Sequence, residues 1–404
     1  MATVLDLRRI EDPRDSVHRT VEALARGHVV GIPTETVYGL AADALNPAAV
    51  QRLVAIKGRS ASMPLAIAVR GEQAIEDFVC HWTALARRFA RRCMPGPITL
   101  VLPCGDPMSI ASRLPASTRE MLLGKHDCIG FRVVAHPVIC QLHEYLRGPL
   151  VLTSANLSGQ PPATRGQEVF SQFGEAVPLV LDDGPTRYGG ASTVVRVIDN
   201  RYEILRQGAI ENAAMKEFAK PMIALVCTGN TCRSPMAETI LKDLLRKAGG
   251  GLESVIVLSA GVAANEGSMA SQQAVEVMEA RGLDLNDHLS RPLSDAIVDR
   301  ADLILTMTRG HRAAILAAWP DRAEQVRTLR RDGGDIADPV GSSVEVYEQC
   351  ASQIERELTA WIESLRADFL PVEQPSSELL DHDAIHGDNH TSNGDGKTDS
   401  QEPL

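Results

Sequence analysis

The stretch VCTGNTCRSPMAE, residues 226–238, decides the fold of the second half of this 404-residue chain. It follows an apolar run, MIALV, and precedes a segment whose apolar residues recur at helical spacing. Pro235 suits the first turn of a helix. The stretch therefore predicts a strand, a tight loop over residues 227–234 and a helix. The N–H groups of such a loop converge on one point, as in anion sites at helix N-termini.

Outward from this loop, apolar runs alternate with amphipathic segments. The runs predicted as strands are 222–226, 255–260, 301–307 and 325–329. Alternation of strands and helices favours a doubly wound α/β fold, in which a parallel sheet carries helices on both faces. Ligands bind at the carboxyl ends of the strands in such folds. The loop after the first strand is therefore the predicted site.

The loop combines a thiol with a guanidinium. Cys227 lies at the base of the predicted anion nest, where the positive field favours the thiolate. Arg233 supplies a planar fork that matches phosphate oxygens. A thiolate that faces a bound phosphoryl group is a nucleophile for phosphoryl transfer. The competing interpretation is a buried structural cysteine on a glycine turn.

Further motifs give this half a family resemblance. Together with SAGV (259–262), ADLILTMT (301–308) and DIADPVG (335–341), the loop resembles the low-molecular-weight protein tyrosine phosphatase family over about residues 221–365. The resemblance implies a set of roles for five residues. These are Cys227 as nucleophile, Arg233 as phosphoryl clamp, Asp338 as general acid and later base, Ser234 as hydrogen-bond donor to the thiolate, and Asn230 as the residue that holds the loop.

The substrate and the second cysteine leave alternatives open. The loop matches the protein-arginine phosphatase branch, in which Thr231 would narrow the mouth and accept a guanidinium hydrogen bond. Val340 follows Asp-Pro where tyrosine-specific members often carry aromatics, so phosphoarginine is favoured over phosphotyrosine. Cys232 either forms a reversible disulfide with Cys227 or packs as a small apolar residue.

The first half shows neither a nucleophile–base pair nor a metal-ligand spacing. Its stretch GIPTETVYGLAADAL, residues 31–45, leads from a strand into a hydroxyl-rich loop. A helix capped by Asn46 follows and ends at the sequence Lys57-Gly58-Arg59. A later strand ends in Ser-Ala-Asn at 154–156. Cations and hydroxyls in one cleft suit the positioning and charge stabilisation of a nucleotide.

Eight collinear motifs also give this half a family resemblance. They are PTETVYGLAADA, KGR, PLAIAV, PGPITLVLP, GFRVVAHP, TSANLSG, ASTVVRV and ILRQGAI. Residues 1–210 thereby resemble the threonylcarbamoyl-AMP synthase (YrdC-like) family, which implies an α+β domain with a twisted open sheet. The implied reaction joins L-threonine, bicarbonate and ATP, with Mg²⁺ on the phosphates and no organic cofactor. Its product would feed downstream tRNA-modifying proteins that form threonylcarbamoyladenosine.

The resemblance assigns eight substrate-binding residues in this half. These are Lys57, Arg59, Ser154 and Asn156 for ATP, Thr34 and Arg132 for threonine, and Ser192 and Arg206 for the nucleotide end. Two positions depart from the family pattern. Ser60 stands where a proline is usual, and Met63 where asparagine or histidine is common. These departures bear on affinity or selectivity for the amino acid.

A non-catalytic alternative exists for the first half, a module that binds double-stranded RNA or a nucleotide, beside a phosphotyrosine phosphatase in the second half. Four arginines in ARRFARR, residues 86–92, lie on a predicted helix. They either contact RNA phosphates or form a solvated helix face. The net charge of residues 1–210 is only +3, which is modest for nucleic-acid binding.

Composition divides the chain into four parts. We predict a synthase domain (1–210), a short linker (211–221), a phosphatase domain (222–368) and a disordered acidic tail (369–404). The N-terminus lacks the apolar core of a signal peptide, and no apolar run approaches the ~20 residues of a membrane-spanning helix. Eight cysteines without a paired framework favour reduced thiols. The sequence thus predicts a cytoplasmic bifunctional enzyme that does not contact a membrane.

Overall fold

The computed structural model describes residues 2–9, 12–58, 64–79 and 82–369. Three residues discussed above, Arg59, Ser60 and Met63, lie outside the described residues, as does almost all of the predicted tail. Among the described residues, no helix is long and apolar enough to cross a membrane.

The first half contains a ten-stranded mixed sheet with the order β1-β8-β2-β3-β7-β4-β6-β5-β9-β10. Its strands are β1 (Thr3–Asp6), β2 (Val30–Ile32), β3 (Gly39–Asp43), β4 (Ala66–Ala68), β5 (Ile98–Pro103), β6 (Cys128–Arg132), β7 (Leu150–Ser154), β8 (Leu179–Asp182), β9 (Thr193–Ile198) and β10 (Arg201–Arg206). The sheet contains both parallel pairs, such as β5–β9, and antiparallel pairs, such as β3–β7. This mixed sheet confirms the predicted α+β class.

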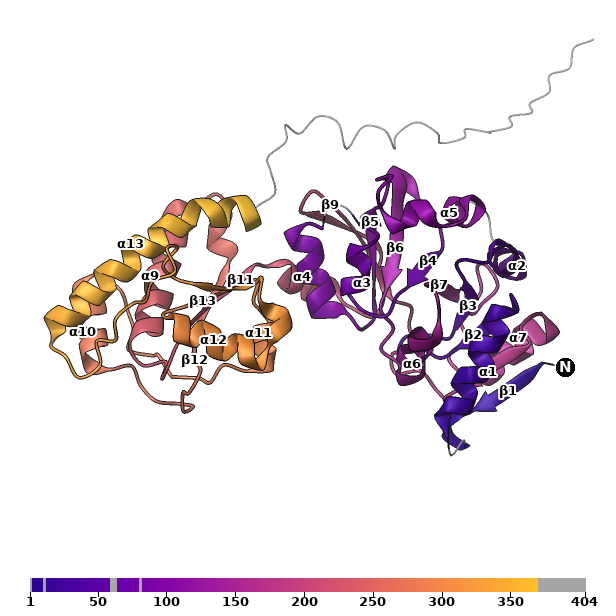
Figure 1. The fold of residues 1–404 in the computed structure, drawn as a ribbon, viewed down its shortest axis with the longest axis horizontal. Coiled ribbons are helices and arrows are strands. Elements are labelled where there is room, and N and C mark those ends of the chain that lie inside the picture. The colour runs from indigo at the N-terminus through magenta and orange to yellow at the C-terminus, as the bar shows by residue number, and fades with distance from the viewer. Residues whose placement is uncertain (1, 10–11, 59–63, 80–81, 370–404) are drawn as a thin grey trace, which may run out of the picture. The chain divides into compact units, whose positions relative to one another are not determined.

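Helices cover both faces of this sheet (Figure 1). They are α1 (Pro13–Ala25), α2 (Pro47–Lys57), α3 (Gln73–Glu76), α4 (Ala84–Cys93), α5 (Ala116–Leu122), α6 (Pro137–Tyr145), α7 (Gly166–Phe173) and α8 (Asn212–Ala219). The two-residue period of strand β7 explains the two cores. Val151 packs into one core, whereas Leu150 and Leu152 pack into the other, beside α1 and α6. Asn46 caps α2 through its side chain, as predicted.

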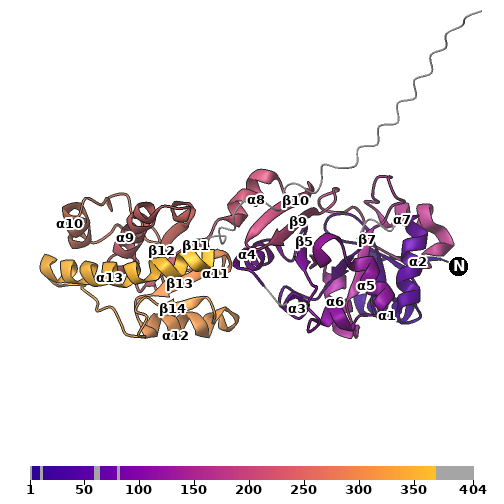
Figure 2. The same cartoon turned by 90° about the horizontal axis from the view of Figure 1, so that it is seen from above.

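The second half contains a four-stranded, all-parallel sheet with the order β12-β11-β13-β14. Its strands are β11 (Met222–Cys227), β12 (Ile256–Gly261), β13 (Leu303–Thr306) and β14 (Val326–Thr328), and each lies within or next to a run predicted as a strand. The helices are α9 (Arg233–Ala248), α10 (Gln272–Ala280), α11 (Asp295–Arg300), α12 (Arg309–Ala318) and α13 (Val344–Phe369). Alternate residues of β11 enter two separate cores, so this half is doubly wound as predicted (Figure 2).

The segment predicted as a linker, 211–221, is more structured than a linker. Residues 212–219 form helix α8, and Met215 is fully buried in the core of the first half. Helix α8 therefore packs as part of that domain, because its apolar face is buried against the core of the first half. At the other end, α13 continues to Phe369, the first residue of the predicted tail.

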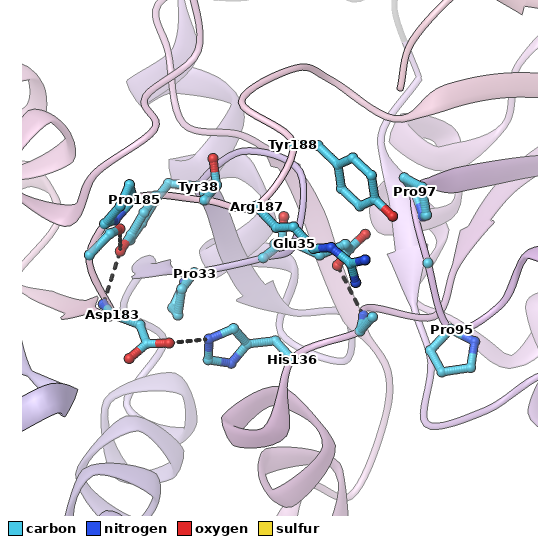
Figure 3. A pocket seen from close by; sticks show the side chains of 15 residues that line it. Pro33, Glu35, Tyr38, Pro95, Pro97, His136, Asp183, Pro185, Arg187 and Tyr188 are labelled. Carbon is cyan, nitrogen blue, oxygen red and sulfur yellow. Dashed lines mark hydrogen bonds and ion pairs between the residues drawn. The ribbon is translucent and has the colours of Figure 1, made fainter. Parts of the chain in front are cut away.

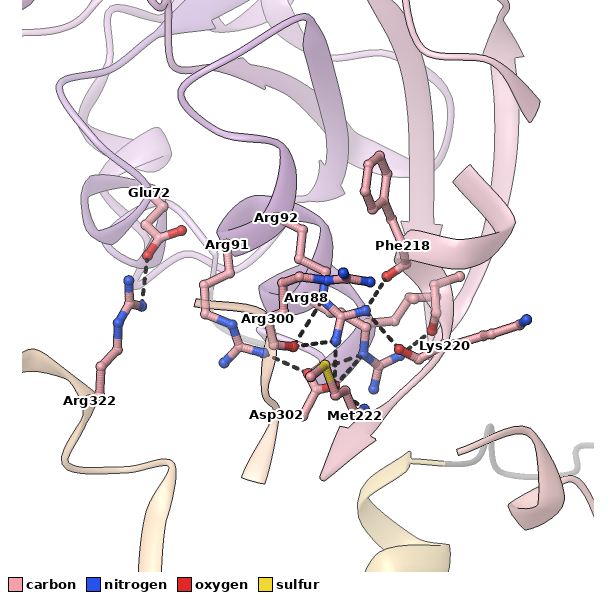
Figure 4. A network of polar contacts seen from close by, with 12 residues as sticks. Glu72, Arg88, Arg91, Arg92, Phe218, Lys220, Met222, Arg300, Asp302 and Arg322 are labelled. Carbon is pink, nitrogen blue, oxygen red and sulfur yellow. Dashed lines mark hydrogen bonds and ion pairs between the residues drawn. The ribbon is translucent and has the colours of Figure 1, made fainter. Parts of the chain in front are cut away.

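Three of the four arginines of ARRFARR neither form a solvated face nor lie open to RNA, whereas Arg87 is 43% exposed. Arg88, Arg91 and Arg92 on α4 pair with Asp302, which directly precedes β13, at N–O distances of 2.6 to 3.0 Å. The Asp302 side chain is only 6% exposed, and those of Arg88 and Arg92 are 2% exposed (Figure 4). Both expectations for these three residues are therefore wrong. Helical spacing showed that they share a face, but not which carboxylate they face.

Backbone groups complete this cluster, which we call the arginine clamp (Arg88, Arg91, Arg92 and Asp302). Arg92 donates to the carbonyl oxygens of residues 218, 220 and 300. The Asp302 carboxylate also accepts the N–H of Met222, the first residue of β11, at 2.8 Å. Burial lowers the pKa of Arg92 to about 10, although Asp302 opposes that shift. The clamp thus joins α4 to the starts of the two central strands of the second sheet.

Candidate active sites

The loop between β11 and α9 is shaped by a buried asparagine. Asn230 has a left-handed backbone with φ 55°. Its side-chain N–H groups donate to Ser234 Oγ at 2.9 Å and Ser259 Oγ at 2.8 Å, while its Oδ1 accepts the N–H of Arg291 at 2.9 Å. The Asn230 side chain thereby joins α9, β12 and the segment that contains Arg291. This geometry is what the loop-holding role assigned to Asn230 requires.

The thiol of Cys227 lies inside this loop. Its Sγ is 2.9 Å from Ser234 Oγ and accepts the N–H of Asn230 at 3.2 Å. Helix α9 begins three residues after Asn230, and the N–H groups of its first turn have no intrahelical acceptor. Gly261, at the end of β12, lets that strand lie close to the loop, because a Cβ at this position would be 2.4 Å from the Thr228 carbonyl oxygen. The loop thus surrounds a sulfur with donors, as a phosphoryl nest requires.

The arginine and the acid that were predicted to act in phosphoryl transfer, Arg233 and Asp338, meet at this loop. Arg233 is 4% exposed and donates to the Ile336 carbonyl oxygen at 3.1 Å. Its other terminal nitrogen donates to Asp338, whose side chain is 46% exposed. The structure therefore brings together all the residues proposed for phosphoryl transfer, although they are separated by up to 111 positions.

The second cysteine of the loop is packed against other groups. Cys232 is buried, and its Sγ lies 3.3 Å from Ser271 Oγ and 3.4 Å from the hydroxyl of Tyr347. Both loop cysteines are free thiols. Burial and the contact with Cys232 raise the pKa of Tyr347 to about 12. In this reduced form, Cys232 packs beneath the loop.

Two histidines that the sequence analysis did not single out also touch the loop. His311 Nε2 lies 2.9 Å from Thr228 Oγ1, and His288 Nε2 donates to the Asn230 carbonyl oxygen at 2.7 Å. Burial lowers the pKa of His311, and the nearby Arg233 charge adds to this shift. His311 follows the carboxyl end of β13 by a few residues. That position, at the edge where ligands bind, was the available signal.

In the first half, Lys57 forms one group of polar side chains. Its ammonium donates to the Ser154 carbonyl oxygen at 2.7 Å and to Asn156 Oδ1 at 2.9 Å. Ser154 Oγ donates to the same Asn156 oxygen. Helix α2 and the end of β7 position these groups, and the Lys57 side chain is nearly fully buried. A cation, a hydroxyl and an amide therefore converge, as predicted for an anion-positioning cleft.

Arg132 forms a second group with the hydroxyl-rich loop. Its guanidinium donates to Thr34 Oγ1 at 3.3 Å, to Glu35 Oε1 at 2.7 Å and to Thr36 Oγ1. All four side chains are buried, and the Arg132 Nε has no protein acceptor. The loop of residues 33–38 leaves the sheet next to Ser154, since Ala155 N–H donates to the Tyr38 carbonyl oxygen. This loop therefore links the Lys57 group to the Arg132 group.

A third group contains Ser192 and Arg206. Arg206 donates to Ser192 Oγ at 3.2 Å and to its carbonyl oxygen at 2.9 Å, while Thr99 Oγ1 lies 2.9 Å from Ser192 Oγ. Burial lowers the pKa of Arg206, and the like charge of Arg132 contributes to that shift. The described residues place seven of the eight assigned positions, and Arg59 lies outside them.

A cavity of about 280 Å³ opens beside Thr34 and contains charges that the sequence analysis missed (Figure 3). Glu35 lines it and accepts the Ala135 N–H at 3.0 Å in addition to the Arg132 ion pair. His136 and Asp183 line it too, with Nε2 and Oδ2 3.2 Å apart. Burial lowers the pKa of His136, which favours a neutral ring. Glu35 belongs to the PTET motif, so its position was the signal for it.

Comparisons with known proteins agree with this division. The Sua5/YciO/YrdC family model, described as telomere recombination, matches residues 22–208. The model of the low molecular weight phosphotyrosine protein phosphatases matches residues 222–370. The first match ends before helix α8, and the second begins after it.

Relatives of each half are named for different activities. A putative threonylcarbamoyl-AMP synthase of Mycobacterium tuberculosis is 31% identical over 218 residues, which is 54% of this chain and 95% of that protein. The threonylcarbamoyl-AMP synthase of Pyrococcus abyssi is 34% identical over 187 residues, 46% of this chain and 52% of that protein.

The relative of the second half is the protein-arginine-phosphatase of Bacillus subtilis, which is 37% identical over 150 residues, 36% of this chain and 97% of that protein. Because the matches to the Mycobacterium tuberculosis and Bacillus subtilis proteins cover 95% and 97% of those proteins, the chain belongs to two families at once: residues 22–208 to the threonylcarbamoyl-AMP synthases, and residues 222–370 to the low-molecular-weight protein tyrosine phosphatases.

Proposed function

We propose that the chain is a bifunctional enzyme that makes threonylcarbamoyl-AMP in its first half and dephosphorylates proteins in its second. The observation that carries the proposal is the separation of two sites of different chemistry. The first half holds Lys57, Arg132 and Arg206 among hydroxyl, amide and carboxylate groups, and the second half places the Cys227 sulfur beside the Asn230 N–H and the Ser234 hydroxyl. Each set of groups suits one of the two reactions and not the other.

In the synthase site, positioning would do most of the work. The Lys57 ammonium would neutralise ATP phosphate charge, and the unpartnered Arg132 Nε is a donor available to the threonine carboxylate. The nucleophile forms when the threonine amine and bicarbonate give a carbamate with loss of water, and a carbamate oxygen then attacks the α-phosphorus and displaces pyrophosphate. Charge stabilisation by fixed donors is worth most in a site screened from water.

Mg²⁺ would enter this site together with ATP. The groups around Lys57 are a hydroxyl and an amide instead of carboxylates. Mg²⁺ is commonly held by substrate phosphates with one or two protein oxygens and several waters. We therefore expect the ion to stabilise phosphate charge without a dedicated cage of protein ligands.

The decisive test of the synthase is threonine- and bicarbonate-dependent exchange of pyrophosphate into ATP by the full chain. Exchange that needs both co-substrates supports catalysis. Nucleotide binding without exchange would favour the alternative of a non-catalytic nucleotide or RNA module. The burial of Arg88, Arg91 and Arg92 withdraws three of the four arginines that were candidates for RNA contact.

In the phosphatase site, Cys227 would attack the phosphorus while Asp338 protonates the leaving group. The resulting cysteinyl phosphate is then hydrolysed by water, with Asp338 as base. We propose phosphoarginine as the preferred substrate. Support comes from the relative named protein-arginine-phosphatase and from Val340, which offers no aromatic ring for a phenol to stack on.

Thr231 provides the test of this preference. The residue is half-buried on the catalytic loop, with its Oγ1 3.6 Å from Cys232 Sγ. We expect wild type to show a higher kcat/KM on phosphoarginine peptides than on matched phosphotyrosine peptides, and Thr231→Ile to lower that ratio about tenfold by removing a hydroxyl acceptor. A better rate on phosphotyrosine by wild type would contradict the arginine assignment, and an unchanged ratio in the variant would exclude Thr231 as its cause.

A further inference from the structure

Two exposed apolar side chains lie opposite each other on loops of the phosphatase domain. Met269 is 71% exposed and Leu289 is 54% exposed. They are partners in an antiparallel bridge, flanked by hydrogen bonds from Gly267 N–H to the Ser290 carbonyl oxygen and from Ser290 N–H to that of Ser268, both 2.8 Å. Directly opposed residues of an antiparallel pair present their side chains on the same face. Met269 and Leu289 therefore form one apolar surface, the rim pair.

Both loops of the rim pair are bonded to the catalytic loop. The N–H of Ser271, two residues after Met269, donates to the Thr231 carbonyl oxygen at 2.9 Å. His288, the neighbour of Leu289, donates to the Asn230 carbonyl oxygen at 2.7 Å. Consecutive Cα atoms are about 3.8 Å apart, so the backbone of each rim residue lies within about 12 Å of the catalytic loop.

This spacing fits a substrate polypeptide that passes over the site. An extended chain advances about 3.3 Å per residue. A residue two to four positions from the phosphorylated one can therefore reach the rim pair. A single exposed leucine needs no explanation, but an opposed apolar pair whose loops are bonded to the catalytic loop does. A third exposed apolar residue, Val340, follows the acid Asp338 by two positions.

We propose that the rim pair binds an apolar side chain of the protein substrate, two to four residues from the phosphorylated residue. The proposal rests on the proposed phosphatase function and adds the substrate class, which is an extended segment with an apolar flanking residue. Removing that side chain and the rim pair from water would stabilise the bound substrate. The effect should appear mainly in KM, because contacts remote from the reacting atoms bind ground state and transition state alike.

The first test uses the wild-type full chain and pairs of phosphopeptides. Each pair has an otherwise Ser/Gly-rich sequence and differs only in Leu or Ser at one position, two to four residues from the phosphorylated residue on either side. We expect kcat/KM to be about three- to tenfold higher for the Leu peptide at one of these positions, as partial burial of one leucine allows. Equal values at all positions would overturn the proposal.

The second test places the preference on the protein. The double variant Met269→Ser/Leu289→Ser should lower the Leu/Ser ratio to about one. The matched control is Met108→Ser, which removes an 84% exposed methionine from the first half and should keep the ratio. A ratio that persists in the double variant would overturn the assignment to the rim pair. Activity of the double variant on p-nitrophenyl phosphate reports whether its catalytic loop is intact.

Two further outcomes separate this proposal from others. If wild type hydrolyses none of the phosphopeptides, the proposed protein phosphatase function itself is wrong. If wild type is a dimer by light scattering and the double variant is a monomer, the rim pair is a contact between copies and the substrate proposal is wrong. If Met269→Ser/Leu289→Ser loses all activity, the single variants Met269→Gln and Leu289→Gln, tested on the same peptide pairs, must lower the ratio for the proposal to stand.

Discussion

The two candidate sites differ in how far apart their residues lie in the chain. In the phosphatase loop, the thiol, the loop-holding asparagine and the guanidinium of Arg233 all lie within eight consecutive residues, 227–234. The contact between Cys227 and Ser234 spans seven positions. In the synthase cleft, Arg132 reaches Glu35 over 97 positions and Lys57 reaches Ser154 over the same separation. The first site is local in sequence, and the second is assembled by the sheet.

This difference teaches how each site depends on the rest of the molecule. The phosphatase loop needs one strand end and one helix start, which β11 and α9 supply. The synthase groups hold one another: Lys57, Ser154 and Asn156 share hydrogen bonds, and Arg132 is fixed by the hydroxyl-rich loop. Single changes should therefore act on the reacting atoms in the first site and on a network in the second.

The largest expected effect removes the local nucleophile. Cys227→Ser should reduce phosphatase turnover to background, while the N–H groups of the loop still bind an oxyanion such as tungstate. Turnover of p-nitrophenyl phosphate and calorimetric titration with tungstate measure the two properties. Threonine-dependent pyrophosphate exchange is the internal control and should not change. Loss of tungstate binding would show that the N–H groups of the loop do not bind an oxyanion without the Cys227 thiol.

The next effect tests whether the two regions are energetically independent. Asp302→Asn removes the carboxylate shared by three buried arginines and should lower the free energy of unfolding by about 3–5 kcal/mol, because unpaired buried charges are costly. Denaturant unfolding of the full chain measures it. The control Glu217→Gln breaks a half-exposed ion pair with Lys220 and should cost no more than about 1 kcal/mol. Equal losses of unfolding free energy in the two variants would mean that the arginine clamp does not couple the two regions.

The third effect probes the network of the synthase cleft. Lys57→Ala should lower synthase activity by about 10²- to 10³-fold, since it removes a cation from a nearly buried site that faces phosphate charge. Pyrophosphate exchange measures it, with exposed Lys216→Ala as the control. Asn156→Ala combined with Lys57→Ala should cost little more than Lys57→Ala alone. Additive losses would show that these residues act separately.

A smaller effect separates protonation from attack in the phosphatase. Asp338→Asn should slow hydrolysis of substrates with poor leaving groups by about 10²-fold and affect p-nitrophenyl phosphate much less, because p-nitrophenolate needs little protonation. The ratio of the two rates is the measurement. Asp335→Asn is the matched control, since that carboxylate pairs with Arg309 on a neighbouring turn. Equal slowing of both substrates would remove Asp338 from the role of acid.

The smallest effect concerns the acid side of the stability profile. Burial, with a contribution from the Arg70 charge, lowers the pKa of His143 on α6 to about 4. The unfolded chain, with a histidine pKa of about 6.5, binds that proton more readily, so stability is lost as pH falls from about 6.5 towards 4. The loss should not exceed about 3 kcal/mol. His143→Gln should flatten the profile and exposed His126→Asn should not, as unfolding at several pH values would measure.

Much of the phosphatase site could be predicted from the sequence because its geometry is local. A strand end, a glycine turn and a helix start place Cys227, Asn230 and Arg233 on one short loop. The packing of Cys232 could not be predicted, since its neighbours Ser271 and Tyr347 come from distant parts of the chain. His311 was missed for the same reason, because its contact with Thr228 joins two different strand ends.

In the synthase half, the sequence indicated which residue types gather but not how they pair. Thr34 and Arg132 were assigned to one substrate, and the structure puts their side chains in contact. The Glu35 carboxylate beside Arg132 and the His136–Asp183 pair were not foreseen, because only the fold brings residues 35, 136 and 183 around one cavity.

By itself, the sequence determined the elements, the two fold classes and the local catalytic loop, since hydrophobic period, capping residues and turn residues act over a few positions. Tertiary structure alone decided the partners of charged groups. The arginines of α4 share a helical face by their spacing, yet a carboxylate more than 200 positions away makes that face a buried contact. A buried charge must find its counter-charge in space, and the folded chain sets that distance independently of separation along the sequence.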